Sequence, residues 1–224
     1  MDSPLTGTAR ALAAIIFDMD GLMIDSESLY WAAGRDVARR FGKPVADQTL
    51  GRMMGRSPID SMRVFAEELR LSESPQRLLE MRDGIALESM RQGVPAMPGL
   101  LEVLAEFRPK YKLGVATSAP LRYAEMILSK LGILDRFDVV QTSDDVVHGK
   151  PDPEIYLKAM GRLGMTPEQC VVLEDSSNGA LAGKRAGAYV IAVPSQYTRD
   201  QDFGFVDYIA ADLLDAARRI NSPV

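Results

Sequence analysis

The sequence predicts an α/β fold in which helices flank a parallel sheet. Short runs rich in β-branched residues alternate with segments of helical periodicity, and this alternation is typical of parallel strands joined by helices. One long stretch, residues 27–92, carries helical patterns only. Because it follows directly on the first predicted strand, we expect an all-helical domain inserted into an α/β core.

The expected domain boundaries follow from the same change of pattern. The apolar run 13–16 is the first strand, so the core comprises residues 10–26 and 93–224, and the inserted domain comprises residues 27–92. Two glycines and two prolines in segment 93–99 mark the return of the chain to the core.

Three helices are predicted in the inserted domain. Ser26 is placed to cap the first of them. Its apolar stripe recurs every four residues and consists of Leu29, Ala33, Val37 and Phe41. The other two helices are expected to begin at Ser57-Pro58 and Ser74-Pro75, because serine caps a helix and proline fits its first turn.

The core is predicted to continue as alternating strands and helices. The further strands are expected at residues 113–116, 137–140, 171–173 and 189–193. The connecting helices are expected at about 100–108, 120–131, 153–163 and 178–186.

Composition excludes several classes of protein. The chain has 224 residues, of which 46% are hydrophobic and 25% charged, with a net charge of −5 and no basic block, so a nucleic-acid partner is not expected. Cys170 is the only cysteine, which rules out an intrachain disulfide. No stretch approaches the roughly 18 apolar residues of a membrane span, and no signal peptide is recognised. We therefore expect a cytoplasmic protein without a membrane partner.

Polar side chains follow several of the predicted strands. They are Asp18 and Asp20 after the first strand, Thr117 and Ser118 after 113–116, and Glu174 and Asp175 after 171–173, with Lys150 in the loop 149–153. In open parallel sheets, ligands bind beyond the carboxyl ends of the strands, so we expect these groups to share one site. Mg²⁺ prefers carboxylates together with phosphate oxygens, which points to phosphoryl chemistry.

Each of these features has a simpler interpretation when taken alone. The two aspartates fit an acidic turn closed by Gly21, Thr117-Ser118 fits a helix cap, and Lys150 fits a solvated loop. Their occurrence in this order at successive strand ends favours a common site.

With these residues in place, the sequence resembles the haloacid dehalogenase superfamily over nearly its whole length. The matching motifs are Asp18-Met19-Asp20-Gly21, Thr117-Ser118, Lys150 and Glu174-Asp175. The longer stretches 17–26 and 148–153 are similar to the phosphoglucomutase-like and phosphatase branch, and a finer likeness links 54–56 and 143–153 to pseudouridine 5′-phosphatases. The resemblance implies a Rossmann-like core with a mobile helical cap.

The resemblance also implies a Mg²⁺-dependent phosphomonoester hydrolase. Asp18 is the expected nucleophile, which forms an aspartyl-phosphate, and Asp20 is the expected general acid and base. Thr117, Ser118 and Lys150 are expected to bind the phosphate. The expected metal ligands are Asp18, the backbone carbonyl of Asp20, Glu174 and Asp175. Arg56 is expected to reach the substrate from the cap.

Other activities of the superfamily fit less well. A phosphomutase carries a histidine in the first cap helix, where this chain has Tyr30, and a phosphonate hydrolase needs a lysine near Arg56. A dehalogenase lacks the second aspartate, which is kept here as Asp20. A phosphatase is therefore predicted, with the mutase as the alternative and a non-catalytic binding protein as a third reading. The expected substrate is a small sugar phosphate or nucleoside-type monophosphate.

Overall fold

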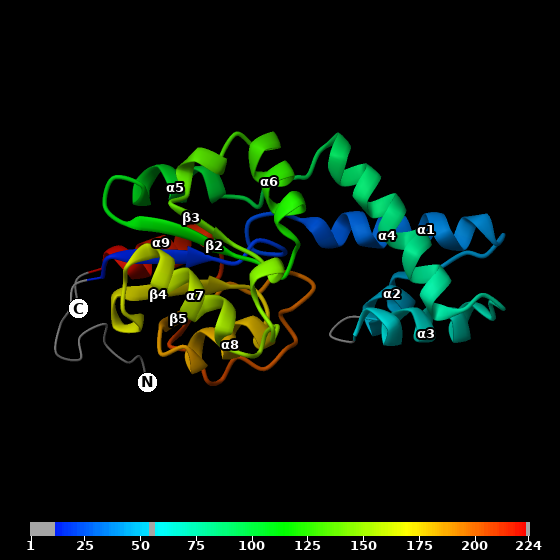
Figure 1. Cartoon of the computed structure of the whole chain (residues 1–224). Helices are drawn as coiled ribbons and strands as arrows, with labels where there is room; N and C mark the ends of the chain where they lie inside the picture. The colour runs from blue at the N-terminus through cyan, green and yellow to red at the C-terminus, as the bar shows by residue number, and fades with distance from the viewer. Residues whose placement is uncertain (1–11, 54–56, 223–224) are drawn as a thin grey trace. The chain divides into compact units, whose positions relative to one another are not determined.

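The computed structural model describes residues 12–53 and 57–222 (Figure 1). The chain divides into two compact units. One unit contains the residues up to Ile24 and those from Pro95 onward, and the other is Asp25–Val94. The larger unit is built on a sheet, whereas the described elements of the smaller one are all helical.

A six-stranded parallel sheet forms the centre of the larger unit (Figure 1). Its strands are β1 (Ala14–Phe17), β2 (Lys112–Ala116), β3 (Val139–Gln141), β4 (Cys170–Glu174), β5 (Tyr189–Ala192) and β6 (Tyr208–Ile209). They lie in the order β3-β2-β1-β4-β5-β6. The first strand of the chain is therefore central, and it pairs with β2 on one side and β4 on the other.

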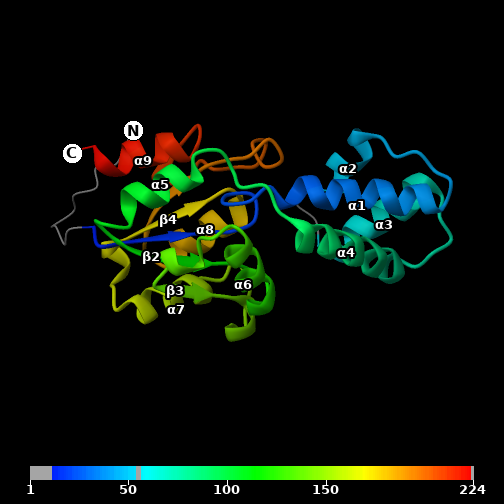
Figure 2. The ribbon, with the colours of Figure 1, turned by 90° about the horizontal axis from the view of Figure 1, so that it is seen from above.

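Helices cover both faces of this sheet (Figure 2). They are α5 (Leu100–Phe107), α6 (Leu121–Lys130), α7 (Glu154–Leu163), α8 (Ser177–Arg185) and α9 (Leu213–Asn221). One face packs against α7 and α8, and α5 and α9 contact one another on the opposite side (Figure 2). Short 3₁₀ turns occur at Leu134–Arg136, Ser143–Asp145 and Pro167–Gln169.

The core explains why the carboxyl ends of the strands are held firmly. All four residues of β1 are buried, and Ala14 and Ile16 belong to the cluster that packs against α7 and α8. Gly183 of α8 lets this helix approach the sheet closely, since a Cβ there would lie 2.9 Å from Val190 and 3.1 Å from Val172. The loops that follow β1 and β4 therefore begin from fixed backbone.

The smaller unit has its own apolar core. Its helices are α1 (Ser26–Arg40), α2 (Asp47–Met53), α3 (Pro58–Leu69) and α4 (Pro75–Gln92). Helix α4 packs against α1 and α3, and the buried side chains include Val37, Leu50, Met62, Phe65 and Leu78. In neither unit does a described helix combine the length and apolarity needed to cross a lipid bilayer.

The local predictions hold in most places and fail in a few. Ser57 and Ser74 cap α3 and α4 as predicted, because their side chains accept hydrogen bonds from the backbone NH groups three residues further on, those of Asp60 and Arg77. The cap predicted at Ser26 is wrong, since Asp25 caps α1 and its carboxylate accepts from Ser28 N at 3.1 Å. The strand predicted at 137–140 starts only at Val139, because Phe137 still terminates a 3₁₀ turn.

Candidate active site

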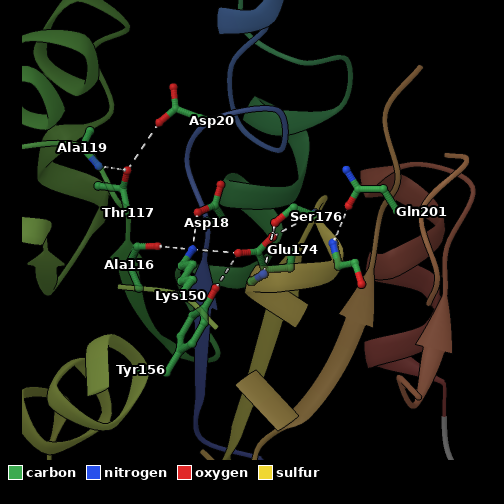
Figure 3. A network of polar contacts seen from close by, with 12 residues as sticks. Asp18, Asp20, Ala116, Thr117, Ala119, Lys150, Tyr156, Glu174, Ser176 and Gln201 are labelled. Carbon is green, nitrogen blue, oxygen red and sulfur yellow. Dashed lines mark hydrogen bonds and ion pairs between the residues drawn. The ribbon is translucent and has the colours of Figure 1, made fainter. Parts of the chain in front are cut away.

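The carboxyl ends of three neighbouring strands bring the predicted polar residues together (Figure 3). Asp18 directly follows β1, Thr117 directly follows β2, and Glu174 ends β4. Because β2, β1 and β4 are adjacent and parallel, their last residues lie side by side at the same edge of the sheet. Asp18, Thr117 and Glu174 are all buried, so their polar groups must find partners within the protein.

Lys150 reaches this edge from the loop before α7. Its Nζ atom donates to Asp18 Oδ1 at 2.5 Å, to Glu174 Oε1 at 2.7 Å and to the backbone carbonyl of Ala116 at 3.1 Å (Figure 3). A lysine has three hydrogens to donate, so all of them are engaged. The loop is held by Glu154, whose carboxylate accepts from the backbone NH groups of Val147 and His148.

Glu174 accepts four hydrogen bonds and is fully buried. Its Oε1 atom accepts from Lys150 and from the hydroxyl of Tyr156 at 3.0 Å. Its Oε2 atom accepts from the backbone NH of Ser176 at 3.0 Å and from the Ser176 hydroxyl at 2.9 Å. Gly179 lies directly against this carboxylate, because a Cβ there would be 1.5 Å from Oε1. The orientation of Glu174 is thus set from both sides.

Gly21 makes room for Asp175, the acidic residue directly after β4. It has a φ of +83°, a backbone conformation that residues with a Cβ atom rarely adopt. A Cβ at this position would lie 2.2 Å from Asp175 Oδ2. The same oxygen accepts from the Thr198 hydroxyl at 3.4 Å. Glycine is therefore required at position 21 for both the turn and the placement of Asp175.

Three carboxylates gather where a metal ion was predicted. Asp18, Glu174 and Asp175 each offer one oxygen, and these oxygens lie within 4.8 Å of one another. All three residues are buried, and hard oxygen donors of this kind are the ligands that Mg²⁺ and similar cations prefer. The donor set therefore fits a divalent cation. The side chain of Asp20 turns elsewhere, since Asp20 Oδ2 accepts from the Thr117 hydroxyl at 3.4 Å (Figure 3).

The electrostatics of the cluster also fit a bound cation. Burial raises the pKa of Asp18 to about 8, with Glu174 and Asp20 adding to the rise and Lys150 opposing it. Burial likewise raises the pKa of Asp175 well above its usual range, and the charges of Glu174 and Asp18 add to it. Burial lowers the pKa of Lys150, but Asp18 and Glu174 outweigh it and raise the pKa well above the ordinary value. The single positive charge of Lys150 does not offset the negative charges of the three ionised carboxylates, and a bound cation would offset the charge that remains.

This pKa of Asp18 predicts a pH effect on stability in the absence of divalent cations. Its ordinary value is 3.8, so folding favours the protonated form, and the resulting stability is full below about pH 4 and lost as the pH rises through 8. In chelator, the melting temperature of wild type should therefore fall by several degrees relative to Asp18→Asn between about pH 4 and 8. Circular dichroism measures both melting curves, and a constant difference across this range would contradict the raised pKa.

Of the other two predicted residues, the structure describes one and leaves the other outside the described ranges. Ser118 is exposed beside Thr117, and Arg56 lies outside the described residues. Four residues that contact Glu174 or Asp175 were not among the predicted ones, namely Tyr156, Ser176, Gly179 and Thr198. Tyr156 lies in a helical segment, where an aromatic residue indicates core packing. Only its short separation in sequence from Lys150 could have marked it as a residue of the site. Ser176, directly after Glu174-Asp175, carries a helix-capping signal that could have been recognised.

Comparison with known proteins identifies the family. The family model described as haloacid dehalogenase-like hydrolase matches residues 15–193. The phosphorylated carbohydrates phosphatase of Thermotoga maritima is 39% identical over 181 residues, which cover 79% of this chain and 82% of that protein. Hexitol phosphatase B of Escherichia coli (strain K12) is 34% identical over 215 residues, which cover 93% of this chain and 96% of that protein.

A solved structure agrees with these relatives. The crystal structure of CbbY from Rhodobacter sphaeroides in complex with phosphate has a TM-score of 0.72 at 27% identity, with 90% of this chain and 95% of that chain covered. The chain therefore belongs to the haloacid dehalogenase-like hydrolases. This confirms the predicted family, the α/β class of fold and the predicted class of enzyme, a phosphatase.

Proposed function

We propose that this chain is a divalent-cation-dependent phosphatase that acts on small phosphorylated carbohydrates through an aspartyl-phosphate. The observation that carries the proposal is the buried pair of Asp18 and Lys150, 2.5 Å apart, beside the carboxylates of Glu174 and Asp175. The Lys150 ammonium fixes the orientation of the Asp18 carboxylate, and burial shields this carboxylate from water. Both properties suit a nucleophile that must approach a phosphate dianion.

Asp18 is the nucleophile in this proposal. One of its carboxylate oxygens attacks phosphorus, the bond from phosphorus to the sugar oxygen breaks, and the phosphoryl group is left on Asp18. Water then attacks the phosphorus, which releases inorganic phosphate and restores the carboxylate. The Lys150 ammonium lies against Asp18 throughout and offsets negative charge that gathers around the phosphoryl group.

Asp20 moves the protons of both steps. It protonates the departing sugar oxygen in the first step and takes a proton from the attacking water in the second. Its contact with the Thr117 hydroxyl supports this assignment, because that contact separates the Asp20 carboxylate from the cluster of Asp18, Glu174 and Asp175. Thr117 directly follows β2 and Ser118 is exposed beside it, and in this proposal the two residues donate hydrogen bonds to phosphate oxygens.

Mg²⁺ is the proposed cation, held by Asp18, Glu174, Asp175 and the backbone carbonyl of Asp20. When bound, it neutralises charge on the phosphate and on the nucleophile. The close fit of Gly21 against Asp175 supports the assignment, because it fixes that carboxylate before a cation arrives.

The substrate class rests on the relatives. One is named for phosphorylated carbohydrates and another for hexitol phosphates, which favours a sugar or polyol phosphate over a nucleoside-type monophosphate. Arg56 of the smaller unit stays a candidate for contact with the organic part of the substrate.

Removal of the divalent cation should abolish phosphate release. The three acidic side chains repel a phosphate dianion unless a cation offsets them, so excess chelator is expected to lower the rate at least a hundredfold and added Mg²⁺ to restore it. A panel of sugar, polyol and nucleoside phosphates, assayed for inorganic phosphate, tests both the activity and the substrate class. Full activity in chelator would contradict the metal assignment, and conversion of β-glucose 1-phosphate to its 6-phosphate without phosphate release would favour the mutase.

A further inference from the structure

Tyr156 is a buried residue that contacts both charged groups behind the nucleophile. It is fully buried near the start of α7, and its hydroxyl donates to Glu174 Oε1 at 3.0 Å. Lys150 Nζ lies 5.0 Å from the centroid of its ring (Figure 3). A single side chain thus touches the lysine with its aromatic face and the glutamate with its hydroxyl.

The hydroxyl is more than a by-product of core packing. A phenyl ring would fill the same space without a polar atom to satisfy, so the buried hydroxyl depends on having an acceptor. That acceptor, Oε1, is the oxygen of Glu174 that also binds Lys150. Tyr156 and Lys150 therefore share the charge of one carboxylate oxygen.

This sharing determines where Lys150 sits. The lysine is held between Asp18 and Glu174, and these two carboxylates compete for its positive charge. The neutral Tyr156 hydroxyl satisfies part of the hydrogen-bonding capacity of Oε1 without adding charge. Among the described residues, loss of the hydroxyl would leave Lys150 as the one side-chain donor to that oxygen and would draw the ammonium toward Glu174, away from Asp18.

We infer that Tyr156 is a positioning residue, which holds Glu174 and Lys150 in the arrangement that the nucleophile requires. It is fully buried and acts through these two groups, so its loss should lower kcat and leave KM little changed. The inference rests on the proposed function for its kinetic consequence. The arrangement of Glu174 also has a consequence without turnover, namely the affinity for Mg²⁺.

The decisive variant is Tyr156→Phe, which keeps the ring and removes only the hydroxyl. We expect kcat to fall about tenfold, the lower end of the range for residues that orient metal-site ligands, with KM within about twofold of wild type. Calorimetric titration with Mg²⁺ alone should show weaker binding by a factor of about three or more. Tyr156→Leu, which also removes the ring beneath Lys150, should lower kcat further.

The matched control is Tyr208→Phe. The Tyr208 hydroxyl also donates to a carboxylate, Asp215 Oδ2 at 3.2 Å, but Tyr208 lies on β6. Loss of this hydroxyl should change the melting temperature without lowering kcat. The inference is wrong if Tyr156→Phe keeps kcat within twofold of wild type, or if its loss of activity matches a loss of folded protein. If wild type releases no phosphate from any phosphomonoester, the proposed function fails, and the Mg²⁺ titration still decides on Tyr156: equal affinities of wild type and Tyr156→Phe overturn its role.

Discussion

Asp18→Asn should abolish phosphate release while the protein stays folded. The amide nearly preserves the shape of the carboxylate, but it cannot form the aspartyl-phosphate, and loss of a nucleophile costs several orders of magnitude in kcat. We expect a decrease of at least about a thousandfold. Steady-state phosphate release and circular dichroism measure the two effects, and acid quenching with ³²P-labelled substrate should trap phosphoprotein in wild type alone.

Asp207→Asn is the matched control for this variant. Asp207 also accepts from a lysine, Lys184 Nζ at 2.7 Å, in the larger unit but away from the site. It should lose stability and keep its kcat. The covalent assignment is wrong if Asp18→Asn retains more than about a hundredth of the wild-type rate.

Asp20→Asn should slow the hydrolysis of sugar phosphates much more than that of aryl phosphates. A sugar alkoxide leaves poorly unless it is protonated, whereas an activated phenolate scarcely needs a proton, and general acid catalysis contributes about a hundredfold or more. The measurement is the ratio of kcat/KM for the two substrates in wild type and variant. A burst of phenolate shows whether slow hydrolysis of the aspartyl-phosphate masks the first step.

The reading of Asp20 depends on that ratio. Equal losses for both substrates, with no burst, would assign Asp20 to the shape of the site and not to proton transfer. Thr117→Val offers an independent check, since it removes the hydroxyl that contacts Asp20 and keeps the side-chain volume. Thr117→Val should shift the ratio of kcat/KM for the two substrates in the same direction as Asp20→Asn, but by less.

Much of the fold could be predicted because its signals are local. The middle residues of β1, β2, β4 and β5 are apolar and buried, so the positions of these strands were predicted to within one residue at every end. The acidic residues that end β1 and β4 follow from the same pattern, since a carboxylate directly after a buried strand must lie at the sheet edge.

Helices α2 and α9 and strand β6 were not predicted. The sequence pattern is weak for α2 and β6, whereas that of α9 was overlooked. Helix α2 is seven residues long and contains Gly51, and β6 is only two residues long, so neither gives a readable period. Helix α9 was detectable, because Asp212 caps it and Leu213, Ala216, Ala217 and Ile220 form its buried stripe.

The bonding inside the site depends on contacts that no local pattern encodes. Tyr156 meets Glu174 only because α7 packs against β2, β3 and β1, and Thr198 meets Asp175 only through the path of the loop after β5. Sequence spacing identifies chemical groups near strand ends. It does not determine which buried neighbour satisfies which oxygen.

The central position of β1 has a consequence for how the protein is made. The strand is synthesised before its two neighbours, which pair with it through Lys112 and Cys170, and Cys170 emerges only after the helices of the smaller unit, β2 and β3 have been made. Until then at least one edge of the apolar Ala-Ile-Ile-Phe segment lacks its strand partner, and such an edge invites association with other chains. The smaller unit, Asp25–Val94, is compact by itself, so its helices can pack together before β4 has been synthesised. A nascent chain stalled before residue 170 should therefore expose this strand to chaperones.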